Sequence, residues 1–316
     1  MDTDSKKKQN DIMNLVKNIP IPICGLILAL LSLGNLTQDI NPYLKILFGG
    51  IGSIFLILII LKIVFYSQTV KEDFKNPVIV SSSGTFSMSL MILSTYLSGF
   101  QSSLAISVWI LGIVLHILLI IYFTYHFIIH DFNISYVYPS YWITFVGITM
   151  AAITSNIHAV TEIGFIFFII GFIFMIITLP LVIYRYLKYP QVPDANKPLI
   201  CIFTAIFSIL IVGYLNSAQN ISSEFVLILY GIACIFYIFS LAKFIEYRNL
   251  EFFPSFSAFT FPFVISALAT KSVLNLIGVN PILNALTKIE IAIAIILVLY
   301  ILIRYIKFLK IVRSRN

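Results

Sequence analysis

The sequence predicts an all-α integral membrane protein with ten transmembrane helices, arranged as five tandem helical hairpins. Of its 316 residues, 60% are hydrophobic and only 10% are charged, whereas a soluble domain has roughly 25% charged residues. Apolar runs long enough to cross a hydrocarbon core of about 30 Å recur along the whole chain. A proline opens every second run, at a nearly constant spacing. Together these three observations place the chain in a bilayer.

The apolar runs alternate between short and long. They cover 19–36, 42–66, 81–99, 103–129, 139–156, 160–187, 198–216, 222–247, 254–274 and 287–311. No stretch between them is long enough for a soluble domain, so we expect a single transmembrane domain over 19–312. The polar stretch 1–18 lacks the hydrophobic core and cleavage site of a signal peptide, and it is expected to form a short tail, as is 313–316.

Five prolines open the odd spans and reveal a repeat. They are Pro20, Pro77, Pro139, Pro198 and Pro254, and successive members are 57, 62, 59 and 56 residues apart, one hairpin each time. One proline in a first helical turn means little, because its missing N–H would lack a partner there anyway. Five in register indicate a repeat. Parallel hairpins related by rotation about the membrane normal close into a quasi-fivefold ring.

The two kinds of span differ in composition. The odd spans carry Gly, Ser, Thr and Pro, whereas the even spans are nearly uniformly Ile, Leu and Phe. Small and polar residues are expected where a helix borders a cavity or another helix, and apolar residues where it borders lipid. We therefore expect the odd helices to line a central pore and the even helices to lie outside.

The basic residues set the orientation. Of the 20 Lys and Arg, 17 fall on the side of the N-terminus, and only Lys45, Lys271 and Lys288 fall on the other side. The positive-inside rule then places both termini in the cytoplasm. Topology accounts for the net charge of +7, so the charge predicts contact with the lipid bilayer and does not indicate a nucleic acid partner.

The sequence offers no catalytic machinery. The spans and loops contain no carboxylate pair, Ser-His-Asp set, Gly-rich phosphate loop or His-x-x-x-His pattern. Cys24, Cys201 and Cys234 lie inside apolar runs without close spacing, which favours packing over a disulfide or a metal site. We expect no enzyme activity, no cofactor and no bound metal.

Few ionisable residues lie within the spans, and such residues are the default functional candidates in a membrane protein. His116 in the fourth span and Lys271 late in the ninth are candidate modulators of transport, with a packed histidine and a lysine that reaches the outer interface as the alternatives. Glu162, Glu224 and Glu290 are each predicted to begin an even helix at its outer end, where the helix dipole favours a carboxylate.

The ninth span, "FPSFSAFTFPFVISALATKSV", combines an apolar character with prolines and hydroxyl groups. Phe261 precedes Pro262 near the predicted middle of the membrane. Proline at this position removes the hydrogen bond to the carbonyl of residue 258 and should kink the helix, which would steer the neighbouring ring inward. By composition alone, Phe261 is either a core residue or a gate.

Four short segments, in order along the repeat, carry a resemblance to a known family. They are "IPIPICG" at Ile19–Gly25, "VKEDFKNPVIV" at Val70–Val80, "YPSYW" at Tyr138–Trp142 and "AFTFPF" at Ala258–Phe263. Together they resemble the tellurite-resistance/dicarboxylate transporter family, which comprises bacterial TehA, yeast malate and sulfite transporters, and the plant guard-cell slow anion channels.

The resemblance implies a homotrimer of ten-helix protomers, each with its own pore. In the family, the second aromatic of the ninth-helix segment is the gating phenylalanine, which matches Phe261. The resemblance also places Gly25, Ala258 and Pro262 along the pore. Three departures concern the width of that pore: Cys24 stands where relatives carry an aromatic, Ile79 replaces an arginine, and Ile206 replaces a proline.

We therefore expect an anion-selective channel that passes small monovalent anions such as chloride or nitrate across the cytoplasmic (inner) membrane of a prokaryote. The alternative is a proton-coupled transporter of C4-dicarboxylates, sulfite or tellurite-type oxyanions. Such a carrier needs a titrating group in its path, and His116 is the only mid-span histidine. A scaffold that transports nothing is disfavoured, because it would not confine polar residues to alternate spans.

Overall fold

The computed structural model describes residues 11–314. Expectations for 1–10 and 315–316, including those for Lys6, Lys7, Lys8 and Arg315, lie outside the described residues.

Five helical segments form an inner ring. The inner segments are η1 (Ile21–Ile23) with α2 (Cys24–Thr37), α5 (Pro77–Leu97), α7 (Ser140–Phe145) with η4 (Val146–Thr149) and α8 (Met150–Ser155), η6 (Asp194–Ile202) with α10 (Phe203–Ser217), and η7 (Pro254–Phe259) with α12 (Phe261–Ile277). Contacts run from α2 to α5, α7 and α8, α10 and α12, and α12 returns to α2. The ring is therefore closed within one chain.

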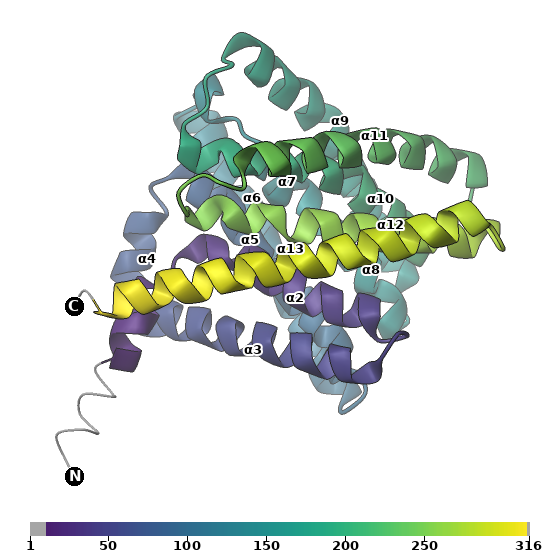
Figure 1. The fold of residues 1–316 in the computed structure, drawn as a ribbon, viewed down its shortest axis with the longest axis horizontal. Helices are drawn as coiled ribbons and strands as arrows, with labels where there is room; N and C mark the ends of the chain where they lie inside the picture. Colours follow the sequence, from purple (N-terminus) through teal and green to yellow (C-terminus); the bar gives the residue numbers. More distant parts are fainter. Residues whose placement is uncertain (1–10, 315–316) are drawn as a thin grey trace.

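Five long helices surround this ring. They are α3 (Pro42–Phe65), α6 (Ser102–Phe123), α9 (Thr161–Lys188), α11 (Ser223–Tyr247) and α13 (Pro281–Ser314). Each packs on the inner segment of its own hairpin, and the described ends of the chain lie on the same side of the molecule (Figure 1). The most apolar stretches of the outer helices are 28–44% buried, against 61–89% for the three inner spans of sufficient length. The predicted division into inner odd and outer even helices is confirmed.

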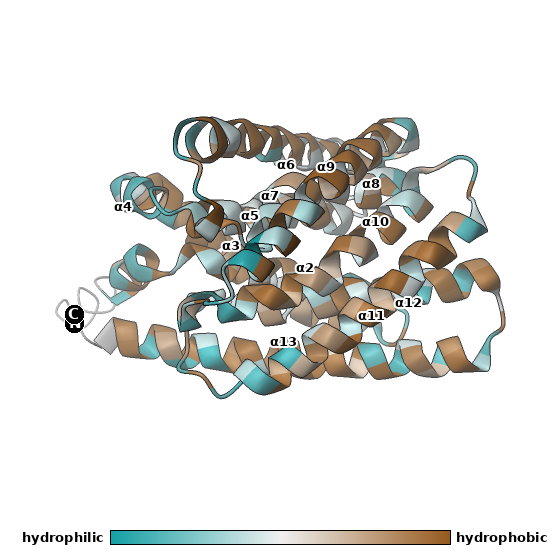
Figure 2. Cartoon of the chain, turned by 90° about the horizontal axis from the view of Figure 1, so that it is seen from above, coloured by the Kyte–Doolittle hydropathy of each residue, from teal (hydrophilic) through white to brown (hydrophobic). Residues whose placement is uncertain are grey.

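The outer surface suits a bilayer. Figure 2 shows hydrophobic residues along much of α6 and α9, with hydrophilic residues at helix ends and in loops. Within residues 11–314, eight helices are long and apolar enough to cross a membrane, and a ninth is reached if Asp11–Asn18 and Ile21–Thr37, which meet at an 85° bend, count as one span. The predicted fifth span, 139–156, does not form one continuous α-helix, because the 3-10 turn η4 separates α7 from α8.

One predicted helix start was wrong by several residues: the tenth span begins at Pro281, because Asn280 caps the helix by accepting a hydrogen bond from Leu283 N. The third span begins at Pro77, the proline predicted to open it, where Asn76 accepts a hydrogen bond from Val78 N. A short helix before the third span, α4 (Ser67–Asp73), was not predicted. The remaining short elements are η2 (Thr124–His130, a π-helical turn), η3 (Ile134–Tyr136) and η5 (Asn156–His158).

The three outer-end glutamates do not share one role. Glu162 and Glu224 lie in the first turns of α9 and α11, as predicted. The prediction for Glu290 was wrong, because the earlier start of α13 places this residue more than two turns inside the helix. Its side chain is buried, and Oε2 accepts a hydrogen bond of 2.8 Å from Thr270 Oγ1 on α12. Glu290 thus ties the last two helices together.

Four of the five inner segments contain 3-10 helix, and α5 is the exception. The effect of Pro262 is larger than the predicted kink, because the ninth span divides completely into η7 and α12. At the division, Thr260 has φ −113° and ψ −82°, outside the helical region. Proline at 262 cannot donate to residue 258, so α12 starts afresh at Phe261.

Close packing between α5 and α6 depends on a glycine. A Cβ atom added at Gly112 would lie 2.9 Å from the backbone oxygen of Ser87 and 2.9 Å from Met91 Cγ. At Gly231, in the middle of α11, an added Cβ would meet nothing within 4 Å. Both glycines lie within outer helices, so they form a matched pair that differs only in surroundings.

Replacing Gly112 with valine should therefore destabilise the protein, because the larger side chain must push the two helices apart. Overpacking typically costs about 1–3 kcal/mol, which we expect to lower the Tm in detergent by at least about 2 °C. The same replacement at Gly231 controls for the effect of valine on helix formation. Equal melting temperatures for the two variants would show that the α5–α6 contact is not tightly packed.

Candidate functional site

A small cavity lies at the centre of the inner ring. About 50 Å³ of it is open to water-sized molecules, and all five inner segments contribute to its wall. One residue from each segment illustrates this: Gly25, Ser82, Ile143, Ile202 and Phe261. A water molecule needs roughly 10–15 Å³ measured in this way, so the cavity has room for only a few small molecules.

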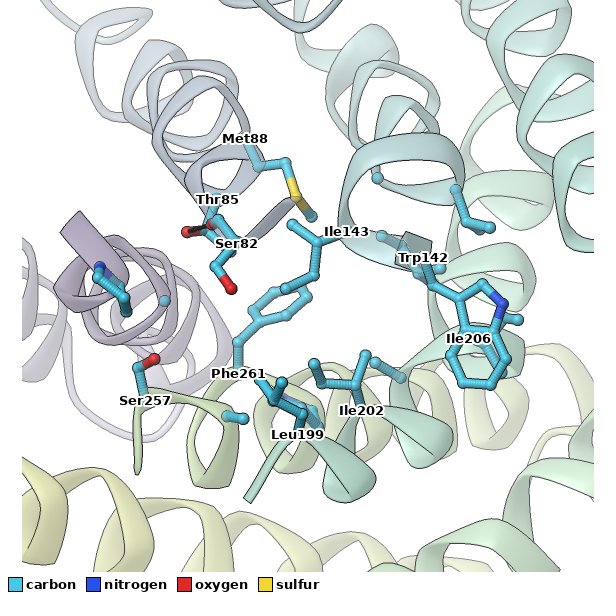
Figure 3. Close-up of a pocket in the computed structure, with 18 residues that line it drawn as sticks. Ser82, Thr85, Met88, Trp142, Ile143, Leu199, Ile202, Ile206, Ser257 and Phe261 are labelled. Atoms are coloured by element: carbon cyan, nitrogen blue, oxygen red, sulfur yellow. Dashed lines mark hydrogen bonds between the residues drawn. The ribbon is translucent and has the colours of Figure 1, made fainter. Parts of the chain in front are cut away.

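Phe261 occupies the middle of this cavity. Figure 3 shows its ring pointing from the start of α12 into the space between Ser82 on α5 and Ile143 on α7. The ring position is set by the break at Thr260, whose Oγ1 donates to the carbonyls of Ser257 and Gly25. The side chain of Phe261 is only 6% exposed, so the ring fills most of the space available to it.

Gly25 allows the segment that carries Phe261 to approach α2. A Cβ atom added at Gly25 would lie 3.0 Å from Ser257 Cβ and 3.1 Å from Ser257 Oγ. Gly25 also borders the cavity, as do Ala258 and Pro262. The structure thus brings all four predicted pore residues to one cavity, and their roles in transport are considered below.

The structure places neither predicted ionisable modulator at the cavity. His116 is fully buried behind Gly147, and its ring nitrogens form hydrogen bonds with Ser87 Oγ (2.7 Å) and the Thr144 carbonyl (2.9 Å). It therefore connects α6 to two inner segments. Lys271 lies away from the cavity, where Nζ forms an ion pair of 2.7 Å with Asp39 after α2.

A wider cavity, which we call the vestibule, lies on the face where the inner segments begin. Its volume is about 380 Å³, and Pro22 lines both it and the central cavity. We call this side of the molecule the proline face, because Pro20 and Pro254 line the vestibule and Asn76 precedes Pro77 there. Every inner segment starts at the proline face, so the positive ends of its helix dipoles lie there.

Sequence reasoning missed the polar lining of the vestibule, although a signal was present. Asn18, Asn76 and Asn196 all line it. Each stands one or two residues before the proline that opens its repeat. An asparagine in register with a repeated proline would have identified these positions as a shared feature of the pore mouth.

The central cavity carries no charged side chain among its lining residues in the described chain. Its polar groups include the hydroxyls of Ser82 and Thr85 on α5. Lys62 and Asp73, which line the vestibule, form an ion pair of 3.0 Å. Within residues 11–314, no three His, Cys, Asp or Glu side chains come together in a way that would hold a metal ion.

The sequence profile of the SLAC1 family, described as voltage-dependent anion channel, matches residues 18–306. The chain belongs to this family. The resemblance expected from the four sequence segments is thereby confirmed, and the chain is a multi-pass membrane protein of a family of anion channels and transporters, not of enzymes. No curated protein matches the chain.

Two of the three expected departures line the cavities of this SLAC1-family protein described above. Ile206 lines the central cavity and Ile79 lines the vestibule. Cys24 faces elsewhere, because it lines a separate apolar cavity bordered by α3, α5 and α6. The cysteine therefore does not widen the central cavity directly.

Valine in place of Gly25 should reduce anion flux, because its side chain would both narrow the cavity and press on Ser257. We expect chloride efflux from proteoliposomes to fall at least about fivefold, since a methyl group in a close-packed site forces its neighbours to move. Adding Ser257→Gly removes the atoms that valine would strike and should restore part of the flux. Flux equal to wild type in Gly25→Val would remove Gly25 from the path.

Proposed function

We propose that this protein is an anion-selective channel for small monovalent anions such as chloride and nitrate, and that Phe261 is its gate. The observation that carries the proposal is the position of the Phe261 ring in a cavity bordered by all five inner segments. Rotation of the Phe261 phenyl ring would open a path along the axis of the inner ring of helices. The helices that carry the lining residues are held in place by packing against each other.

Selectivity follows from the neutral character of the cavity. An ion must lose most of its water to pass a space of about 50 Å³. Large, weakly hydrated anions lose water most easily, and the hydroxyl of Ser82 supplies a hydrogen-bond donor of the kind an anion needs, whereas that of Thr85 donates to the Ser82 carbonyl. Helix dipoles that point their positive ends into the vestibule favour anions over cations at the proline face.

The proposal includes an orientation and an assembly. Basic residues at the helix ends of the proline face, such as Lys17, Lys75, Lys188 and Lys307, support a cytoplasmic location for this face and for both termini in a prokaryotic inner membrane. A ring that closes within one chain supports one pore per protomer, as expected for a homotrimer whose subunits each hold a transmembrane domain over 19–312.

Truncating the gate tests the proposal directly. Phe261→Ala removes the ring from the cavity and should raise the single-channel conductance severalfold or more, as measured in planar bilayers under a potassium chloride gradient. The reversal potential should stay near the value for chloride. Phe261→Leu should give an intermediate conductance, because leucine fills part of the same space.

Phe263→Leu is the matched control for this experiment. Phe263 lies two residues further along α12, is fully buried, and packs against Tyr237 with ring centroids 5.6 Å apart instead of lining the cavity. We expect its conductance to resemble that of wild type. Unchanged currents in Phe261→Ala, in protein that remains folded and assembled, would reject Phe261 as the gate.

The alternative function, a proton-coupled carrier for C4-dicarboxylates, sulfite or tellurite-type oxyanions, requires a different kind of site. It needs a titrating group that meets the substrate, and His116 is separated from the cavity by Gly147 and Met88. The hydrogen bonds of His116 to Ser87 and Thr144 support a packing role.

Proton movement distinguishes channel from carrier. Under the channel proposal, chloride or nitrate flux in proteoliposomes is not accompanied by a change in internal pH, and His116→Gln conducts to within about twofold of wild type, because the residue lies outside the path. A pH-sensitive dye inside the vesicles makes the measurement. Malate or sulfite uptake coupled to proton entry, and lost in His116→Gln, would favour the carrier.

A further inference from the structure

In three of the five repeats, a cation on the outer helix binds a backbone carbonyl just before the proline that opens the same repeat. The hydrogen bonds run from Lys62 Nζ to Ile19 O (2.8 Å), from Arg185 Nη2 to Ser135 O (3.2 Å) and from Arg304 Nη2 to Leu250 O (3.1 Å). Ser135 and Leu250 each stand four residues before their proline. The two arginines therefore occupy equivalent places in the third and fifth repeats.

Arg185 is buried without a counter-ion among the described residues. Its side chain is 1% exposed. The guanidinium also donates to the carbonyls of Tyr189 and Gln191, and it lies over the rings of Tyr138 (4.3 Å) and Tyr186 (4.8 Å). No carboxylate of the described chain forms an ion pair with it. Every partner of this cation is neutral.

Arg304 repeats the arrangement. Its guanidinium donates to the hydroxyl of Tyr300 and lies 5.1 Å from the ring centroid of Phe256 and 5.8 Å from that of Phe252. As with Arg185, the ion pairs within residues 11–314 do not include it. Arginine suits such a site because it stays ionised, matches several carbonyls at once and stacks on aromatic faces.

The third member, Lys62, is neutralised. Asp73 lies 3.0 Å from its Nζ, so the two charges largely cancel. Three further lysines near the proline face are also paired, in Lys75–Glu72, Lys197–Asp194 and Lys243–Glu246. Arg185 and Arg304 differ from these four lysines, because neither arginine is in an ion pair within the described residues.

Each arginine stacks on an aromatic ring that is close in sequence to a residue of the cavity wall. Tyr138, on which Arg185 stacks, is four residues before Trp142, and Trp142 lines the central cavity. Phe256, on which Arg304 stacks, is next to Ser257, which lines the same cavity. A layer of aromatic rings has a low dielectric constant and excludes salt, so the field of each charge reaches the path with little screening.

We propose that Arg185 and Arg304 are specificity-determining residues that hold an uncompensated positive charge behind the pore wall, with the permeating anion as their counter-charge. The inference rests on the proposed anion-channel function. It assigns anion preference to one buried side chain, Arg185, and one partly buried side chain, Arg304, which never touch the ion, and not to the exposed lysines of the proline face.

Arg185→Gln and Arg304→Gln, compared with Lys188→Gln and Lys307→Gln, test the proposal. Each control lies three residues further along the same helix, is exposed, and removes the same charge. We expect each arginine variant to lower the chloride conductance and the chloride-to-potassium permeability ratio at least about threefold in 0.1 M and in 1 M salt. The lysine variants should change either quantity less than about twofold and match wild type in 1 M salt, where the screening length is about 3 Å.

A second pair of variants leaves both arginines in place. Ser135 is half-exposed, and its carbonyl binds Arg185. Ser135→Asp adds a carboxylate near the guanidinium, whereas Ser135→Asn adds an uncharged side chain of the same size. We expect lower conductance and a lower permeability ratio in Ser135→Asp than in Ser135→Asn, with equal Tm values.

Two further variants test the role of charge. Asp73→Asn removes the carboxylate that pairs with Lys62, which leaves the lysine charge uncompensated and should raise the chloride-to-potassium permeability ratio. Arg185→Lys keeps the charge of Arg185 and should retain most of the wild-type permeability ratio even if its Tm falls.

Several results would overturn the proposal. They are arginine variants that match their lysine controls, an Arg185→Lys ratio as low as that of Arg185→Gln, or identical behaviour of Ser135→Asp and Ser135→Asn. In each case the arginines would only fasten the chain ahead of the inner helices, and the anion-channel function would stand. An absence of anion current in the wild type would instead overturn both the proposed function and this inference.

Discussion

A lipid bilayer offers no hydrogen bonds to the backbone, and this constraint explains the two-layer plan of the molecule. Four of the five inner segments contain 3-10 helix, and the ninth span breaks outright at Thr260. Such irregular backbone is tolerated at membrane depth only where protein or a cavity surrounds it. The outer layer of long helices provides that cover, which leaves the inner segments free to be shaped by proline and glycine.

Neutral and charged side chains are also found in different parts of the protein. The cavity around Phe261 is neutral, with hydroxyls among its polar groups, so in the proposed channel it would hold an anion only weakly. Charge is placed instead at the proline face, either paired, as in Lys62 and Asp73, or buried alone, as in Arg185. A path that is weakly attractive throughout suits conduction, because an ion must enter and also leave.

The hairpin repeat and the inner and outer layers could be predicted, because prolines in register and alternating composition are local features of the sequence. The grouping of Phe261, Gly25, Ala258 and Pro262 was expected from the family resemblance. The break at Thr260 and the internal position of Glu290 follow from Pro262 and from the cap at Asn280, signals in the sequence whose effect was underestimated. The divided fifth span has no such local signal. The isolation of Arg185 was also hidden, because a sequence shows which acids are nearby along the chain but not which are nearby in space.

The contact between α12 and α2 closes the ring, and it joins the last hairpin to the first. During synthesis, a chain with only four hairpins would therefore have a gap in its inner wall, with the hydroxyl groups of α5 and the 3-10 backbone turned towards lipid. Phe261 enters with the last hairpin, so the same event seals the wall and places the ring at its centre. A chain with only four hairpins inserted would form an inner wall that is open on one side and would not enclose a pore. The order of insertion would therefore help to prevent ions from leaking across the membrane during synthesis.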